Sequence, residues 1–326
     1  MMRRLRWWLL RRVHHLEYAW LLPLLALLPL LARLPLALAW PLAGWRGWMN
    51  GRLGRDWCSV ALGTAHVERQ TLLGYRQLAP QATPAQQQRR CRQRFAVESR
   101  DEFEACWLGA RRLGALECSF DAPAQALLQR QSGRGLVLLT PHFDSFYLRV
   151  AFLAQASGRR FNLMSSAVFR DPRVGPAVTR HFARKYAAME LHLNGGLVPE
   201  MENGLRPFYR MLAEKETLVV LVVLGDASKL PHGAAMTVDF LGGQRELAGG
   251  AMRLAQHSGS DLGGFVCRCV GPGRYELQVC APGSPDEPAT LTRVYAMFSQ
   301  AITAQPGAWW AADLLPQMPL AVPSGP

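Results

Sequence analysis

The stretch LVLLTPHFDSFYLRVAFLA, residues 136–154, decides the fold class. It opens with a continuous apolar run, which is typical of a strand buried on both faces of a parallel sheet. Pro141 ends this run, and from Ser145 onward apolar side chains recur at helical spacing. A buried strand followed at once by a helix is the repeating unit of α/β proteins. His142 and Asp144 lie between the two, at the carboxyl end of the strand, where such sheets bind ligands.

The rest of the chain repeats this alternation of strand and helix. Four apolar runs predict strands of the same kind: 135–139, 161–165, 188–193 and 217–224. Helical spacing predicts helices at 59–80, 83–108, 145–156, 172–187 and 203–214. After a Gly-Gly turn, the patterns predict a helix at 248–258, strands at 261–270 and 274–280, and a helix at 289–303. We therefore predict an α/β fold with a mostly parallel central sheet flanked by helices.

The first 50 residues predict a hydrophobic, membrane-anchoring helical segment. Residues 18–32 carry no charge, but they are fewer than the ~20 that a spanning helix needs. Prolines recur every six residues from Pro23 to Pro41, which argues against one straight helix. The tryptophans of this segment suit the headgroup level of a bilayer. The segment either crosses the membrane or lies in one leaflet, and the alternatives are a cleaved signal peptide and a core helix.

Composition narrows the partners. The chain carries 37 Lys+Arg against 24 Asp+Glu, a net charge of +13, which favours an anionic partner. No nucleic-acid recognition motif occurs, so we expect an anionic membrane surface or an acidic carrier protein and no nucleic acid. The seven cysteines form no C-x-x-C pair, which predicts no metal site and a reduced body that faces the cytosol. A re-entrant or interfacial anchor agrees with that orientation. We divide the chain into an anchor at 1–50, an α/β domain at 51–312 and a disordered tail at 313–326.

His142 is the candidate general base. An imidazole accepts a proton from a hydroxyl, and it needs a partner that fixes its tautomer. Asp144 is the nearest carboxylate in the sequence, and it is either that partner or the N-cap of the helix that starts at Ser145. Tyr147 is a second candidate partner for the ring. The alternative for His142 itself is a helix-entry histidine with no chemical role.

Five residues are candidates for substrate binding: Tyr147, Arg170, Arg206, Asp226 and Arg245. Arg170 and Asp226 each follow a predicted strand, so we expect them at the same edge of the sheet as His142. Arg206 and Arg245 offer guanidinium groups that bind phosphates or acidic sugars. Arg245 also follows two glycines, where the backbone can approach a ligand closely. The alternatives are solvated surface charges for the arginines and a helix cap for Asp226.

The motif HFDSFYL resembles the histidine motif of the lipid A biosynthesis (late) acyltransferases, in the lysophospholipid acyltransferase superfamily. Those proteins show His-Phe-Gly-Asn-Trp-Glu-Leu after a strand. His142, Phe143 and Leu148 match it, while Tyr147 stands where the family has its acid. Two longer segments are similar to further regions of the family: MTVDFLGGQRELAGGAMRLAQHSGSDL, residues 236–262, and QPGAWWAAD, residues 305–313.

This resemblance implies a reaction and its partners. Such an enzyme moves a fatty acyl chain from a thioester, on acyl carrier protein or CoA, to a hydroxyl or amine of a bacterial envelope glycolipid. It works at the cytoplasmic face of the inner membrane, with the acyl thioester as co-substrate and no other cofactor. His142 would take the proton of the acceptor. Because Tyr147 replaces the acid, either Asp144 orients His142, or the protein is an inactive relative that binds lipid or assists polysaccharide assembly.

Overall fold

The computed structural model describes residues 28–62, 64–167, 174, 176–222, 235–318 and 320. Two of the predicted site residues, Arg170 and Asp226, lie outside these ranges. The first 27 residues of the predicted anchor lie outside them as well.

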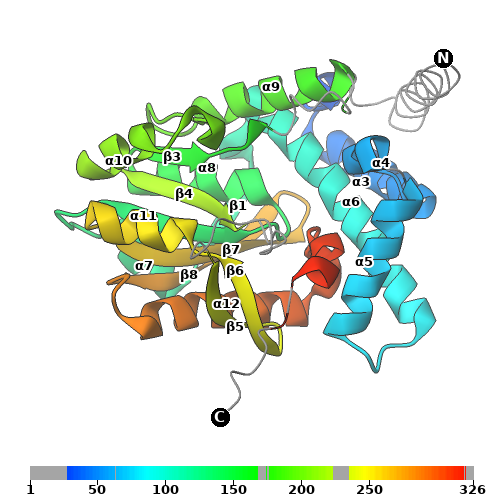
Figure 1. Ribbon diagram of the computed structural model, residues 1–326. Helices are drawn as coiled ribbons and strands as arrows, with labels where there is room; N and C mark the ends of the chain where they lie inside the picture. The colour runs from blue at the N-terminus through cyan, green and yellow to red at the C-terminus, as the bar shows by residue number, and fades with distance from the viewer. Residues whose placement is uncertain are drawn as a thin grey trace, which may run out of the picture.

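A six-stranded sheet lies at the centre of the molecule (Figure 1), with the strand order β1-β8-β7-β2-β4-β3. The strands are β1 Glu117–Phe120, β2 Leu136–Pro141, β3 Phe161–Met164, β4 Thr217–Val222, β7 Asp261–Gly271 and β8 Arg274–Gly283. Neighbouring strands are parallel, except that β7 and β8 form an antiparallel hairpin. The predicted α/β class and the mostly parallel sheet are therefore confirmed.

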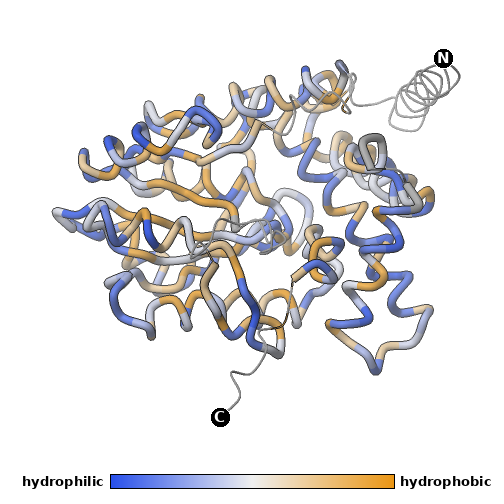
Figure 2. Tube along the Cα trace, in the orientation of Figure 1, coloured by the Kyte–Doolittle hydropathy of each residue, from blue (hydrophilic) through white to orange (hydrophobic). Residues whose placement is uncertain are grey.

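Strand β2 shows why the sheet is covered on both faces. All six of its residues are buried. Val137 and Leu139 join one core cluster, whereas Leu136 and Leu138 join another, because successive side chains of a strand point to opposite faces. Figure 2 shows hydrophobic residues along the central strands and hydrophilic ones along much of the hairpin formed by helices α5 Thr64–Leu78 and α6 Pro84–Gly109.

Helices supply the other half of each core cluster. One cluster takes side chains from α10 Arg206–Ala213, α11 Gly250–Ser258 and α12 Pro288–Ala304. The other takes side chains from α7 Ala122–Leu128, α8 Phe146–Ser157 and α9 Pro176–Glu190. The helices predicted from the sequence in these regions are confirmed, with ends that differ by a few residues. Strand β1 and helix α7 were not predicted, because both are too short to show a clear period.

Helices before the sheet form a separate packed group beside it (Figure 1). They are α2 Leu28–Leu31, α3 Leu36–Leu53, α4 Trp57–Leu62, α5 Thr64–Leu78 and α6 Pro84–Gly109. Helix α6 starts with a capping box, since the Thr83 hydroxyl accepts from the Gln86 amide at 3.3 Å and the Thr83 amide donates to the Gln86 side chain at 2.8 Å. Gly51 lets α3 lie against α6, because a Cβ there would meet the Arg92 carbonyl oxygen at 2.5 Å.

The structure corrects two predictions. Residues 188–193 are not a strand: they form the end of α9 and the turn after it, where the His192 amide donates to the Met189 carbonyl at 2.8 Å. The alternating pattern misled because Met189 and Leu193 are also one helical turn apart and both are buried. The tail is also ordered further than predicted, since η6 Ala312–Gln317 is a 3₁₀ helix that buries Leu315.

The strands β5 Ala235–Phe240 and β6 Gly243–Ala248 form a hairpin whose turn lies one residue before the predicted Gly-Gly pair. Leu241 and Gly242 form the turn, and both have a positive φ. A two-residue hairpin turn needs this backbone because it matches the right-handed twist of the two strands. Among the described residues, no helix has both the length and the apolar composition needed to cross a bilayer. The membrane-anchoring part of the fold prediction is therefore unsupported.

Candidate functional site

A cavity of about 340 Å³ lies at the carboxyl ends of the central strands. Its floor includes Met164 at the end of β3 and Leu221 near the end of β4. Helices α4, α6 and α9 and the segment after η5 Pro306–Ala308 supply the remaining walls. The cavity therefore lies at the edge where doubly wound sheets bind ligands.

His142 lines this cavity from the loop after β2. Its ring meets Trp310 edge-on with a centroid distance of 4.6 Å, and it lies nearly parallel to Phe146 at 6.1 Å. The His142 carbonyl oxygen accepts from the Trp310 amide at 3.1 Å. The predicted histidine thus lies on the wall of a cavity, held between two aromatic side chains.

A buried arginine on α8 holds the backbone of the loop that carries His142. Arg149, on α8, donates to the Pro141 carbonyl at 2.5 Å and to the Phe143 carbonyl at 3.1 Å. It therefore binds the backbone on both sides of His142. Burial lowers the pKa of Arg149 to about 10. Sequence reasoning missed this residue, because an arginine directly after the motif looks like part of a solvated helix face.

The Asp144 carboxylate forms hydrogen bonds with partners that the sequence did not predict. Its backbone has a positive φ of 50°, which short polar residues tolerate. One carboxylate oxygen accepts from the Arg100 guanidinium, and the other accepts from the Cys269 amide at 3.1 Å. Asp144 lines a second cavity of about 470 Å³ rather than that of His142. The N-cap interpretation of Asp144 is wrong, because the N-cap residue of α8 is Ser145. The Ser145 side chain makes no cap hydrogen bond, and another residue binds the first turn of the helix.

Asp101 of α6 supplies that contact. Its Oδ1 accepts from the Phe146 amide at 3.2 Å, and its Oδ2 accepts from Lys185 Nζ at 2.6 Å. Lys185 Nζ also lies 3.8 Å from the centre of the Tyr147 ring, a cation–π contact. Burial, with the Asp101 charge, raises the pKa of Tyr147 well above its ordinary value. Tyr147 stands where the similar acyltransferase motif has an acid. In this chain that position thus carries a neutral phenol that packs on the ion pair of Asp101 and Lys185.

Two of the predicted cations, Arg206 and Arg245, do not join His142. Arg206 is exposed at the start of α10 and lines a third cavity, of about 740 Å³, together with Arg160 and Glu216. Arg245 is buried in β6, where it donates to the Phe240 and Met318 carbonyls at 3.2 Å each. Arg245 therefore ties its hairpin to the C-terminal segment, and its burial also contradicts the alternative of a solvated surface charge. Of the predicted site residues that the structure describes, only His142 and Tyr147 share a cavity.

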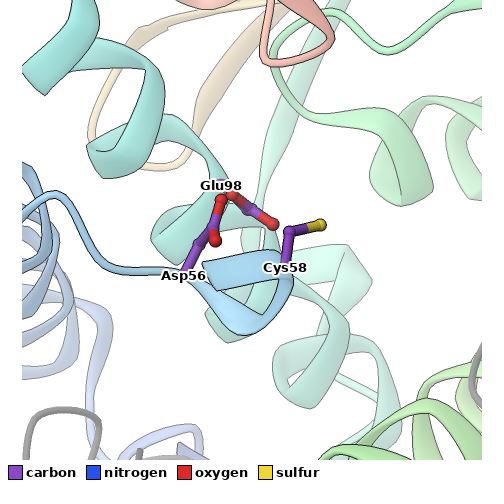
Figure 3. Close-up of side chains that lie close together, drawn as sticks. All are labelled: Asp56, Cys58 and Glu98. Atoms are coloured by element: carbon purple, nitrogen blue, oxygen red, sulfur yellow. The ribbon is translucent and has the colours of Figure 1, made fainter. Parts of the chain in front are cut away.

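One group in the described part of the chain has the spacing of metal ligands. Atoms of Asp56, Cys58 and Glu98 lie within 4.8 Å of one another (Figure 3). Both Asp56 oxygens already have donors: Oδ1 accepts from the Ser59 amide at 2.7 Å and its hydroxyl at 2.6 Å, and Oδ2 accepts from Arg94. Arg94 also binds Glu98 at 2.9 Å. The donor set therefore fits an ion cluster better than a metal centre, since a cation already occupies it.

The protonation of this cluster supports that interpretation. Burial, together with the charge of Asp56, raises the pKa of Glu98 well above its ordinary value. Burial would raise the pKa of Asp56 too, but Arg94 and the hydrogen bonds outweigh it and lower that pKa. Burial raises the pKa of the Cys58 thiol, so a thiolate ligand is disfavoured. The two carboxyl groups and Arg94 thus form an ion cluster in which Glu98 favours its protonated form and Asp56 its ionised form.

The chain matches no model of a known protein family and no curated protein. A function is therefore inferred from the site itself and from the histidine motif that surrounds His142. The site offers an imidazole on the wall of a cavity that also contains several apolar and aromatic side chains. Such an arrangement can bind a hydrocarbon chain and can accept a proton from a group held beside the ring.

Proposed function

We propose that the protein is a membrane-associated acyltransferase that moves a fatty acyl chain from a thioester to a hydroxyl or amine of a bacterial envelope glycolipid. The observation that carries the proposal is the position of His142 on the wall of the 340 Å³ cavity. Leu163, Phe182 and Leu221 line the same space, which suits an acyl chain. The motif around His142 is similar to that of the late acyltransferases, and this similarity supports the choice of reaction.

The proposed chemistry is a single displacement. His142 takes the proton of the acceptor hydroxyl while the oxygen of that hydroxyl attacks the thioester carbonyl carbon. The new C–O bond forms, the C–S bond breaks, and the thiolate of the carrier takes the proton back from the imidazolium. Arg149 keeps the loop in place during this exchange through its bonds to the carbonyls on either side of His142. The acyl thioester is the co-substrate, and acyl carrier protein or acyl-CoA is the proposed donor.

The exposed face of α3 supports attachment to an anionic membrane. Leu38, Leu42, Trp45 and Trp48 follow one another along this helix and are 58%, 42%, 54% and 56% exposed. An apolar face with two indoles suits the interface of a bilayer. The Arg52 guanidinium lies 5.2 Å from the Trp48 ring, where it can meet a lipid phosphate. We propose the cytoplasmic face of the inner membrane as the location.

A second candidate function has one specific observation in its favour. Tyr147 stands at the position of the family acid, and Asp144 is bonded to α6 and β7. Replacing a carboxylate that orients a general base can lower the rate by orders of magnitude. The protein would then be an inactive relative that binds lipid in the His142 cavity and assists envelope polysaccharide assembly.

Acyl transfer by the purified protein tests the proposal. The assay measures transfer from dodecanoyl acyl carrier protein, and separately from dodecanoyl-CoA, to a glycolipid extract. We expect His142→Ala to lower the rate by ~10²-fold or more. His257→Ala is the matched control, because His257 is an exposed histidine on α11, outside the cavity. Full activity of His142→Ala would refute the role of His142 as the general base. If the unaltered protein binds lipid but transfers no acyl chain, the second candidate function, an inactive relative, is favoured.

A further inference from the structure

A second histidine lines the same cavity, from another element of the fold. His181 lies on α9, one turn before Lys185, and both side chains line the cavity that contains His142. His181 is 7% exposed. Its Nε2 atom is buried and has no hydrogen-bond partner within the described part of the chain. A buried polar atom without a partner is rare in folded proteins and calls for an explanation.

Packing gives no reason for an imidazole at this position. The neighbours of His181 on the buried side of α9 are Val178 and Phe182, both part of an apolar cluster. The Phe182 ring centre lies 5.9 Å from that of His181. A phenylalanine or leucine at position 181 would fill the same space without an unsatisfied nitrogen. The cost of the imidazole therefore indicates a ligand that is absent from the structure.

The surroundings define the chemistry of that ligand. Burial, and the charges of Lys185 and Arg46, lower the pKa of His181 well below its ordinary value, so the ring is neutral. Among the described residues, the lysine and the arginine on the cavity wall are already paired, Lys185 with Asp101 and Arg94 with Asp56. Neither is available to balance a free carboxylate. The cavity thus favours a ligand with a hydrocarbon chain and one uncharged polar group.

We propose that His181 Nε2 donates a hydrogen bond to the carbonyl oxygen of an acyl thioester bound in this cavity. The proposal rests on the proposed function for the choice of a thioester as the ligand. It gives His181 a substrate-binding role that is distinct from the proton transfer proposed for His142. A neutral imidazole with its proton on Nε2 donates to a carbonyl without adding charge to the cavity. His181 would hold the carbonyl from α9 while His142 receives the acceptor from the β2 loop.

Two ligands that differ by the carbonyl oxygen test the proposal. Dodecanoyl-CoA carries the thioester carbonyl, and S-dodecyl-CoA is the thioether without it. We expect the unaltered protein to bind dodecanoyl-CoA ~3- to 10-fold more tightly, as one hydrogen bond allows. His181→Phe should bind both ligands equally within about twofold, by the same reasoning. Isothermal titration calorimetry, without any acceptor, gives the four dissociation constants.

Control variants separate the role of His181 from a change in folding. His181→Gln keeps a side-chain N–H donor and should keep part of the preference, so it serves if His181→Phe fails to fold. His192→Gln is the matched control, because His192 is another buried histidine, outside the cavity, whose Nε2 already bonds the Leu108 carbonyl at 2.9 Å. It should leave the preference unchanged.

Three results would overturn the proposal: no binding of either ligand, no preference in the unaltered protein, or a full preference in His181→Phe. The experiment is independent of catalysis. Preference for the carbonyl without acyl transfer would remove the proposed reaction and keep the binding role of His181. Transfer without that preference would do the opposite.

Discussion

Breaking the buried pair of Asp101 and Lys185 should destabilise the fold strongly. The two side chains are only 2% and 5% exposed, and their charged atoms lie 2.6 Å apart. Asp101→Asn leaves the Lys185 ammonium buried without a counter-charge, which typically costs ~3–5 kcal/mol. Lys185→Met leaves the Asp101 carboxylate with only the Phe146 amide at 3.2 Å, so a cost at the lower end of that range is expected.

The double variant shows whether the charge is responsible. Asp101→Asn with Lys185→Met removes both charges, so its cost should fall short of the sum of the single costs by ~2 kcal/mol or more. Urea denaturation followed by circular dichroism gives each free energy of unfolding, and urea is preferred because it does not screen charges as a salt does. Arg160→Met is the control, since Arg160 is half exposed where it pairs with Glu216 and should cost at most ~1 kcal/mol. Single costs under ~1 kcal/mol, or additive costs in the double variant, would refute this reasoning.

Two further predictions concern pH and membranes. Burial raises the pKa of Glu104 from 4.5 to about 8, so the folded state holds a proton that the unfolded state releases, and stability should fall as the pH rises through this window. Glu104→Gln should flatten that fall, whose slope is at most ~1.4 kcal/mol per pH unit, in urea titrations at pH 5, 6, 7 and 8; an unchanged slope would contradict the assignment. Replacing both Trp45 and Trp48 by serine should weaken sedimentation with phosphatidylglycerol-containing vesicles ~10-fold or more, because two indoles leave the lipid interface. Leu197→Ser, an equally exposed apolar residue away from α3, should bind as the unaltered protein does, and equal effects of the two changes would argue against the α3 face.

The sheet and the histidine loop were predictable because their signals are local. The apolar run 136–139 needs burial on both faces, and a strand with helices on either side of the sheet provides it. The break at Pro141 and the helix after it follow from the same short stretch. His142 could be placed at the strand end for this reason alone, without knowledge of the rest of the chain.

The partners of the loop were not predictable, because they come from distant segments. The acids of α6 look like a solvated face in the sequence, yet Glu98, Asp101, Glu102 and Glu104 are all buried. They are buried because α6 contacts α3, α8 and α9. Asp101, Glu102 and Glu104 find a basic or hydroxyl partner on or beside those helices, and Glu98 pairs with Arg94 of α6 itself. His181 was missed for a related reason: a lone histidine on an amphipathic helix carries no sign of what its ring will face.

The pairing of the histidine loop with residues 308–310 has a consequence for biosynthesis. The Asp144 amide donates to the Ala308 carbonyl at 2.8 Å, and the Trp310 amide donates to the His142 carbonyl at 3.1 Å. During translation the loop leaves the ribosome long before these two partners exist. A nascent or prematurely terminated chain that lacks Trp310 therefore carries His142 without the backbone that holds it, and the pocket wall closes only when this late segment docks.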